Sequence, residues 1–169
     1  MRSLRIFSIA VITVFFFISL NCTIKYYDTN KLINDYTTDG FLDTDHYQVI
    51  VKGKPDADAK GLVAARESSL NDAKSRIEDT VLNNLVEYNY QYYLDKLNIK
   101  DEKKIQNVQY VKQDLRKQML QFYSFGYIAF EYYNPDNSAV IVYRIFKDNL
   151  LKKIESIKPD IKLIENKEK

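Results

Sequence analysis

The chain has 169 residues, of which 28% are charged and 46% hydrophobic, and this balance predicts one folded domain rather than a disordered chain. Without Arg2 and Arg5, the 25 basic residues of the whole chain fall to 23, equal to the 23 acidic residues. A neutral chain without a basic cluster argues against nucleic-acid binding. One cysteine and one histidine exclude an internal disulfide and leave little for a catalytic centre, so we expect no enzyme, no cofactor and no metal site.

Residues 1–21 have the pattern of a secretory signal peptide. Arg2 and Arg5 form a short positive region, and residues 6–20 (IFSIAVITVFFFISL) follow as an uncharged run of 15. A helix that spans a bilayer needs about 20 apolar residues, so this run is short for a membrane span. The alternatives are an uncleaved anchor and ordinary secretion, although Leu20 and Asn21 fit poorly before an ordinary signal-peptidase cut.

Cys22 follows this apolar run directly. Residues 18–22 (ISLNC) resemble a relaxed lipobox of the spirochaete kind, with Ser19 and Asn21 where the usual pattern has Leu and Gly or Ala. The resemblance implies that residues 1–21 are removed and that Cys22 is lipidated. Thr23 follows instead of Asp, which by the same resemblance favours the outer membrane. Each buried methylene of an acyl chain contributes about 0.8 kcal/mol, so two or three chains hold a protein firmly on a bilayer.

The folded part is predicted to begin after a tether. Residues 22–44 show no clear period, and we interpret them as the lipidated cysteine and a tether. Residues 46–53 (HYQVIVKG) alternate between apolar and polar side chains, which predicts a half-buried strand. Its core side is predicted to hold Tyr47, Val49 and Val51, and the alternate residues are predicted to face the other way.

A long amphipathic helix is predicted over residues 59–95, where apolar residues recur at steps of three and four. We expect Asp56 or Asp58 to cap its start. Because the segment is long for a small domain, we expect a break near Asn83 and Asn84.

A second helix is predicted over residues 103–123, and the period then changes to two. Residues 127–133 (YIAFEYY) and 140–145 form a predicted hairpin around the turn at residues 134–137. One face of its first strand is predicted to hold Ile128, Phe130 and Tyr132.

The predicted domain ends with a short helix and a tail. The last helix covers residues 149–157, with Asp148 as its cap and Pro159 as its stop, and residues 159–169 form a frayed charged tail. Residues 45–158 therefore form an α+β domain of order β-α-α-β-β-α. We expect a mainly antiparallel, three-stranded sheet packed on one long helix plus shorter helices.

Two stretches together resemble a known family. VIVKGKPDADAKGLVAARESSLNDAKSRI and FEYYNPDNSAVIVYRIFKDNLLKKI are similar to the bacterial lipoproteins typified by the twenty-kilodalton Lpp surface lipoprotein, and to a domain of some flagellar accessory proteins. The resemblance covers residues 47–157 and implies an envelope protein without enzymatic activity. The matching positions include Gly53, Pro55, Arg66, Pro135 and Arg144, which we interpret as structural. The Tyr- and Asn-rich middle, and Lys54 where the family often has a second Gly, depart from the pattern.

Several residues have two interpretations. Tyr90 and Tyr93 are candidates for a partner-binding surface, or they pack against the second helix or the tether. Arg66 and Arg144 are candidates for buried structural arginines that pair with an acid such as Glu131, or else for ligand-binding residues, and we favour the structural role.

A calcium-loop pattern runs from Asp56 through Asp58 to Glu67. Lys60 occupies a ligand position of this pattern, and its ammonium would repel the ion. An acidic helix start is therefore the preferred interpretation.

The sequence thus predicts a lipid-anchored protein of the outer membrane that acts as a structural or protein-interaction module. Its expected partners are the membrane, through the N-terminal lipid, and a protein of the envelope. Exposure on the cell surface and exposure to the periplasm both fit. The alternative is a periplasm-facing carrier of a small hydrophobic ligand, with a pocket between the sheet and the long helix.

Overall fold

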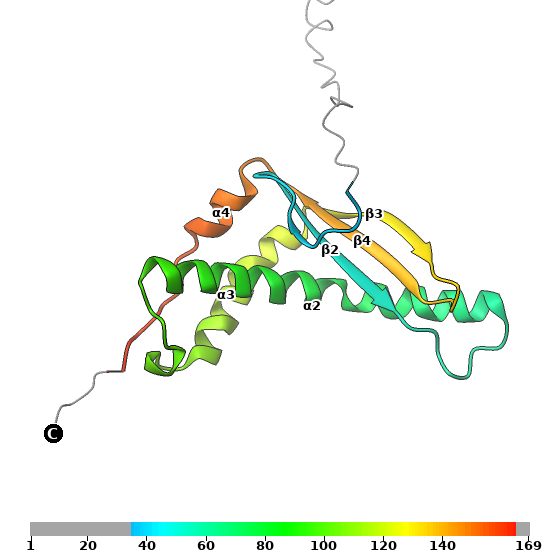
Figure 1. The fold of residues 1–169 in the computed structure, drawn as a ribbon, viewed down its shortest axis with the longest axis horizontal. Helices are drawn as coiled ribbons and strands as arrows, with labels where there is room; N and C mark the ends of the chain where they lie inside the picture. The colour runs from blue at the N-terminus through cyan, green and yellow to red at the C-terminus, as the bar shows by residue number, and fades with distance from the viewer. Residues whose placement is uncertain (1–34, 165–169) are drawn as a thin grey trace, which may run out of the picture. The chain divides into compact units, whose positions relative to one another are not determined.

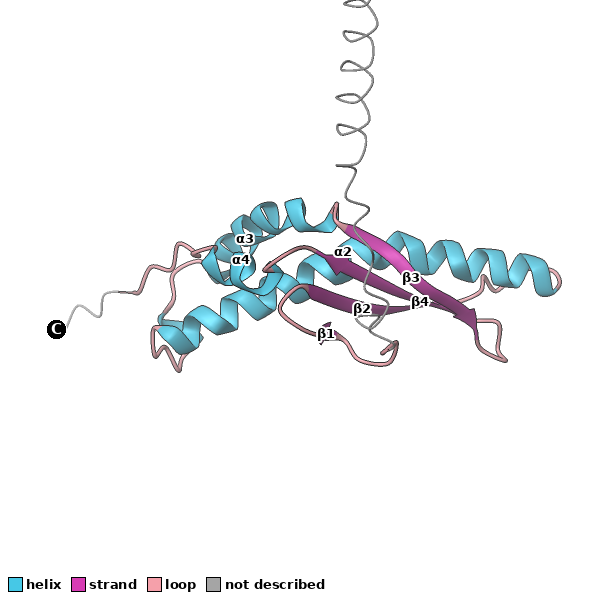
Figure 2. Cartoon of the chain, turned by 90° about the horizontal axis from the view of Figure 1, so that it is seen from above, coloured by secondary structure: helices cyan, strands magenta, loops and turns pink. Residues whose placement is uncertain are grey.

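The computed structural model describes residues 35–164, which form an α+β fold around one antiparallel sheet (Figure 1). The elements in chain order are β1 (Gly40–Phe41), β2 (His46–Gly53), α2 (Leu62–Lys96), the 3-10 helix η2 (Glu102–Lys104), α3 (Val108–Tyr123), β3 (Gly126–Tyr133), β4 (Ala139–Phe146) and α4 (Leu150–Ser156). The strand order is β1-β2-β4-β3, and every neighbouring pair is antiparallel. The long helix α2 packs on the sheet, and α3 and α4 pack on α2 (Figure 2).

The sheet confirms the predicted α+β class with a long helix, but it has four strands rather than three. The additional strand, β1, is two residues long and pairs with Tyr47 and Gln48 of β2. It lies within residues 22–44, so the end of the predicted tether belongs to the sheet. A strand of two residues is too short to show an alternating pattern, and the sequence therefore gives no sign of it.

β2 has the predicted bounds, and Tyr47, Val49 and Val51 are buried in the core as expected. Gln48 faces the other way, as predicted, but it is also completely buried, which a half-buried strand does not predict. Its side chain lies between Arg144 and the backbone of Thr38, so hydrogen bonds replace the contacts with water that it would otherwise make.

Helix α2 is continuous over 35 residues, about 52 Å at 1.5 Å per residue. The predicted break near Asn83 and Asn84 is wrong, because both side chains are exposed while the buried stripe continues past them. The predicted caps are also wrong. The helix begins after Gly61, whose φ is 89°, without a side-chain cap, because a left-handed glycine turns the chain into the helix beyond the two aspartates.

The predicted helix over residues 103–123 is divided into η2 and α3. Asn107 separates them with a φ of 56°, a left-handed conformation that asparagine tolerates and that a right-handed helix cannot contain. Ile105, next to it, is buried and forms a β-bridge with Leu163. Residues 162–164 are therefore paired with the chain around Ile105, and this part of the predicted tail is not frayed.

The hairpin forms as predicted, with Asn137 in a left-handed conformation at φ 64°. A β-bulge between Ile128 and Phe130 changes the alternation of β3. Ile128 pairs with Tyr143, which belongs to the core side of β4, whereas Phe130 pairs with Val142 on the opposite side. The prediction that Ile128 and Phe130 share one face of the strand is therefore wrong. The sequence pattern of apolar residues continues through a bulge, which explains the wrong assignment.

Helix α4 begins after Asn149 rather than after the predicted cap Asp148. Asn149 has a φ of 56° and donates its backbone N–H to Oδ1 of Asp45 at 2.7 Å. A contact with a loop far away in the sequence therefore fixes the start of this helix, and a local capping pattern cannot predict such a contact.

Candidate interaction surface

Exposed aromatic side chains gather along β3 and the residues that flank it. The aromatic surface, as we call it, consists of Phe125, Tyr127, Phe130, Tyr132 and Phe146, which are 40–48% exposed. Phe125 lies next to Phe146 in the hydrogen-bonded ladder, and the rings of Phe130 and Tyr132 are 5.8 Å apart. Because an aromatic side chain offers roughly 150–250 Å², the surface presents about 400–500 Å² of apolar area. That equals the largest patch of a typical soluble monomer, and such patches are often binding sites.

Arg144 of β4 holds the start of the described chain beside this surface. Its guanidinium is buried and donates two hydrogen bonds to Oε1 of Gln48, from Nε at 3.0 Å and from Nη2 at 2.5 Å. Nη2 also donates to the carbonyl oxygen of Asp35 at 2.8 Å. Tyr36 then lies against the Arg144 guanidinium and packs on Phe130 with the two rings tilted by 31° and their centres 5.1 Å apart. Asp35 and Tyr36 are thus held next to the aromatic surface.

The predicted arginine roles are right for one residue and wrong for the other. Arg144 is buried as expected and donates to the neutral side chain of Gln48, whereas Glu131 is exposed on β3. Arg66 is exposed, and its guanidinium lies 5.1 Å from the ring centre of Tyr133. This cation–π contact links α2 to the end of β3.

Tyr90 and Tyr93 do not form an exposed surface. Tyr90 is completely buried with the Lys112 ammonium 4.7 Å from its ring centre, and Tyr93 is 7% exposed and donates its hydroxyl to the Glu155 carbonyl. Helices α3 and α4 both pack on this part of α2, so side chains that diverge from its apolar stripe are still covered. Packing against the second helix, the alternative interpretation, is correct for Tyr90.

Burial also shifts the acidity of these tyrosines. Desolvation raises the pKa of Tyr90. Burial, and then the hydrogen bond from the Tyr88 hydroxyl to Oε1 of Glu155, raise the pKa of Tyr88 to about 12. Both groups therefore stay neutral over the physiological range, and neither is a candidate base.

The remaining family-like positions lie where a structural role is expected. Gly53 is buried at the end of β2, and a Cβ atom there would lie 1.8 Å from the backbone oxygen of Ser69. Pro55 lies in the loop that follows, and Pro135 lies in the hairpin turn. None of the three belongs to the aromatic surface.

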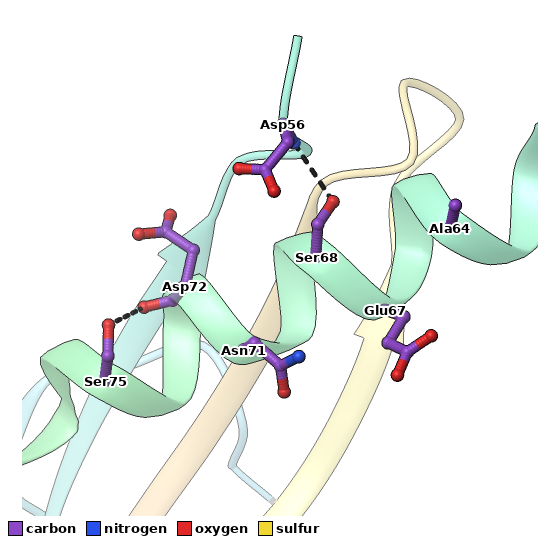
Figure 3. A pocket seen from close by; sticks show the side chains of 7 residues that line it. All are labelled: Asp56, Ala64, Glu67, Ser68, Asn71, Asp72 and Ser75. Carbon is purple, nitrogen blue, oxygen red and sulfur yellow. Dashed lines mark hydrogen bonds between the residues drawn. The ribbon is translucent and has the colours of Figure 1, made fainter. Parts of the chain in front are cut away.

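A shallow depression of about 410 Å³ lies between the loop after β2 and the first turns of α2 (Figure 3). Its lining is polar and consists of Asp56, Ala64, Glu67, Ser68, Asn71, Asp72 and Ser75. Two residues of the calcium-like pattern, Asp56 and Glu67, thus lie near each other, but Asp58 is not part of the lining. Across residues 35–164 no group of three or more His, Cys, Asp or Glu side chains is arranged to hold a metal ion.

The interface between α2 and the sheet is filled by side chains. Val49, Ala73 and Ile141 meet there, and each is completely buried in one contiguous core. This packing gives no support to a ligand pocket between the sheet and the long helix.

Comparisons with family models, curated proteins and solved structures find no match to this chain. Cys22 and the predicted signal peptide lie outside the described residues. Within residues 35–164 no helix is both long and apolar enough to cross a bilayer.

Proposed function

We propose that the protein is a lipid-anchored lipoprotein of the outer membrane that acts as a structural or protein-interaction module. Lipidation of Cys22 supplies the membrane attachment, and residues 35–164 supply the module. The proposal for the N-terminus comes from the sequence, in which a short apolar run ends at the only cysteine. Whether the module faces the periplasm or the outside of the cell does not affect the physical argument.

The aromatic surface is the observation that carries the interaction part of the proposal. Burying tyrosine and phenylalanine against a partner releases water from about 400–500 Å² of apolar surface, at about 25 cal/mol per Å². Aromatic residues are enriched in protein interfaces because they offer large contact areas at low conformational cost. The surface lies on a rigid sheet, so little entropy is lost when a partner binds.

The lipid anchor is tested by the mass of the N-terminal peptide after expression in a diderm bacterium. An acylated peptide that starts at Cys22 supports the proposal. The Cys22→Ala variant is the control and should keep residues 1–21 without acyl mass. An unmodified peptide that starts at Met1 in the wild type would contradict lipidation and leave the apolar run as the anchor.

The interaction surface is tested by photocrosslinking in intact cells, with a photoreactive phenylalanine in place of Phe130. We expect a discrete crosslinked product at this position. The same replacement at Tyr110, which is 64% exposed on α3, is the matched control and should give none. Equal crosslinking at both positions would show that the aromatic surface has no special role.

A further inference from the structure

The two edges of the sheet are treated differently. On the β2 side, backbone groups that point away from β4 have partners outside the sheet or in the loop before it. Two of these partners come from the chain before β2: the His46 carbonyl accepts from Leu42 N at 3.0 Å, and Ile50 N donates to Asp39 Oδ1 at 2.6 Å. The other two come from α2: the Lys52 carbonyl accepts from Arg76 Nη2, and Lys54 N donates to Asp72 Oδ2 at 2.8 Å. With β1 paired to Gln48 and Tyr47, this edge offers no free row of donors and acceptors to another strand.

The β3 edge has no such partners. Asn134 N donates to the Ser138 carbonyl, and in an antiparallel ladder every second pair is hydrogen-bonded. The N–H and C=O groups of Glu131 and Tyr133 therefore point away from β4. Within residues 35–164, these outward groups make no hydrogen bond. An unpaired row of this kind is a template for strand addition.

We propose that β3 pairs with β3 of a second copy of this chain, antiparallel, about a two-fold axis at Tyr132. In this register Glu131 lies opposite Tyr133 of the other copy, and their outward backbone groups exchange hydrogen bonds on both sides of the axis. Tyr132 then faces its own counterpart in a pair that has no backbone hydrogen bonds, where side chains are closest.

The charge pattern of β3 fits a second copy. The strand GYIAFEYY contains one charged residue, Glu131. A register centred on Tyr132 places each Glu131 beside a tyrosine, so no two carboxylates face each other. Cross-strand aromatic pairs contribute about 0.2–1 kcal/mol each, and Tyr132 provides one on the axis. The identical edge therefore pairs without like charges opposite each other and needs nothing that the chain lacks.

The contact is predicted to be reversible. Strand addition places the two aromatic surfaces side by side rather than face to face, so the two copies bury less than their combined area of about 800–1,000 Å², which is below the usual range of a stable interface. The bulge between Ile128 and Phe130 restricts regular pairing to the residues after it, and bulges at sheet edges limit uncontrolled addition. Confinement of anchored chains to a membrane raises their effective concentration. The gain in effective concentration rests on the proposed function, whereas the unpaired edge of β3 does not.

Cysteine crosslinking tests the inference in the full chain, in the membranes of a diderm host. Acylated Cys22 cannot form a disulfide, so a cysteine introduced at Tyr132 is the only free thiol. Cβ atoms of such facing residues lie about 4.5–5.5 Å apart, close to the spacing of a disulfide. With an added oxidant we expect Tyr132→Cys to give a dimer of twice the chain mass.

Phe130→Cys is the matched control on the same strand, since Phe130 is 47% exposed and Tyr132 is 41% exposed. Its distance from its own counterpart is about 13 Å, four residues at 3.3 Å, so it should crosslink severalfold less. Val63→Cys, which is 79% exposed on α2, should give only background. Equal dimer from all three variants, or none from Tyr132→Cys, would overturn the proposed pairing.

Two outcomes separate this inference from the proposed function. A dimer band from the wild-type chain would mean that Cys22 is a free thiol, which contradicts lipidation. The pairing would then be judged from Tyr132→Cys in a Cys22→Ser chain, purified in detergent at high concentration. A Tyr132→Cys product heavier or lighter than twice the chain mass would identify a different protein at the edge, and this would overturn the choice of a second copy.

Discussion

The buried guanidinium of Arg144 on β4 donates two hydrogen bonds to one acceptor, the side-chain oxygen of Gln48 on β2. These two strands form the central pair of the sheet. Both residues are at most 5% exposed. A buried cation needs hydrogen-bond acceptors to offset the loss of water, and the side-chain oxygen of Gln48 is one of them.

Gln48→Ala is therefore expected to destabilise the fold by about 2 kcal/mol, since hydrogen bonds to charged groups contribute about 1.5–3 kcal/mol. Urea denaturation monitored by circular dichroism measures this change. Gln91→Ala is the control, because Gln91 is an exposed amide that also bonds to another side chain, and it should shift stability by no more than about 0.5 kcal/mol. Equal effects of the two substitutions would show that burial of the Gln48 amide does not increase its contribution to the free energy of unfolding.

Gly53 is expected to tolerate no side chain. A Cβ atom there would lie 1.8 Å from Ser69 O and 2.6 Å from Ala73 N, both of them backbone atoms of α2. Because backbone of a packed helix cannot move aside cheaply, Gly53→Ala should cost about 3 kcal/mol or more. Thermal denaturation should show a large drop in Tm, while Lys54→Ala, an exposed neighbour, should show almost none. A Tm close to that of the wild type would mean that α2 shifts freely against β2.

The parts of the fold that follow from periodicity were predictable. The alternation of Tyr47, Val49 and Val51 gave β2 its bounds, and the steps of three and four gave α2. The positive φ angles of Asn107, Asn149 and Gly61 were harder to predict, because the sequence permits a left-handed conformation at such residues but does not require it.

The site could be predicted only in part. Burial of Tyr90 depends on where α3 packs, and burial of Gln48 depends on Arg144, 96 positions later in the chain. The aromatic residues of β3 were visible as YIAFEYY, with steps of three and two between Tyr127, Phe130 and Tyr132. That irregular spacing marks the bulge, and it is the signal that a strict alternation misses.

Asn89 connects α2 to the end of α4. Its side-chain Nδ2 donates to the carbonyl of Ile154, in the last turn of α4, at 2.6 Å and to the carbonyl of Ile157, the C-cap residue, at 3.0 Å. Asn89→Ala should therefore destabilise the protein by about 1–3 kcal/mol.

Hydrogen exchange gives this prediction a local readout. In Asn89→Ala, amides of α4 should exchange faster while those of β4 change little. Asn71→Ala, an exposed position on the same helix, serves as the control and should leave α4 unchanged. A uniform acceleration across the sheet would instead point to global loss of stability rather than release of α4.

Alkaline pH should destabilise the fold through its tyrosines. Burial, followed by the hydrogen bond to Glu155, raises the pKa of Tyr88 to about 12, and burial also raises the pKa values of Tyr47, Tyr90 and Tyr143. The folded protein thus keeps protons that the unfolded chain loses above its ordinary tyrosine pKa of about 10. This contribution to stability is complete below about pH 10 and is lost as the pH rises toward 12.

Urea midpoints between about pH 8 and pH 11 should therefore stay level at first and then fall. Tyr88→Phe removes one of the responsible hydroxyls, so its midpoint should fall less steeply above pH 10 than that of the wild type. Tyr110→Phe, which alters an exposed tyrosine, should retain the wild-type slope. If Tyr88→Phe also retained that slope, the interaction between Tyr88 and Glu155 would not contribute to the alkaline loss, and the other buried tyrosines would have to account for it.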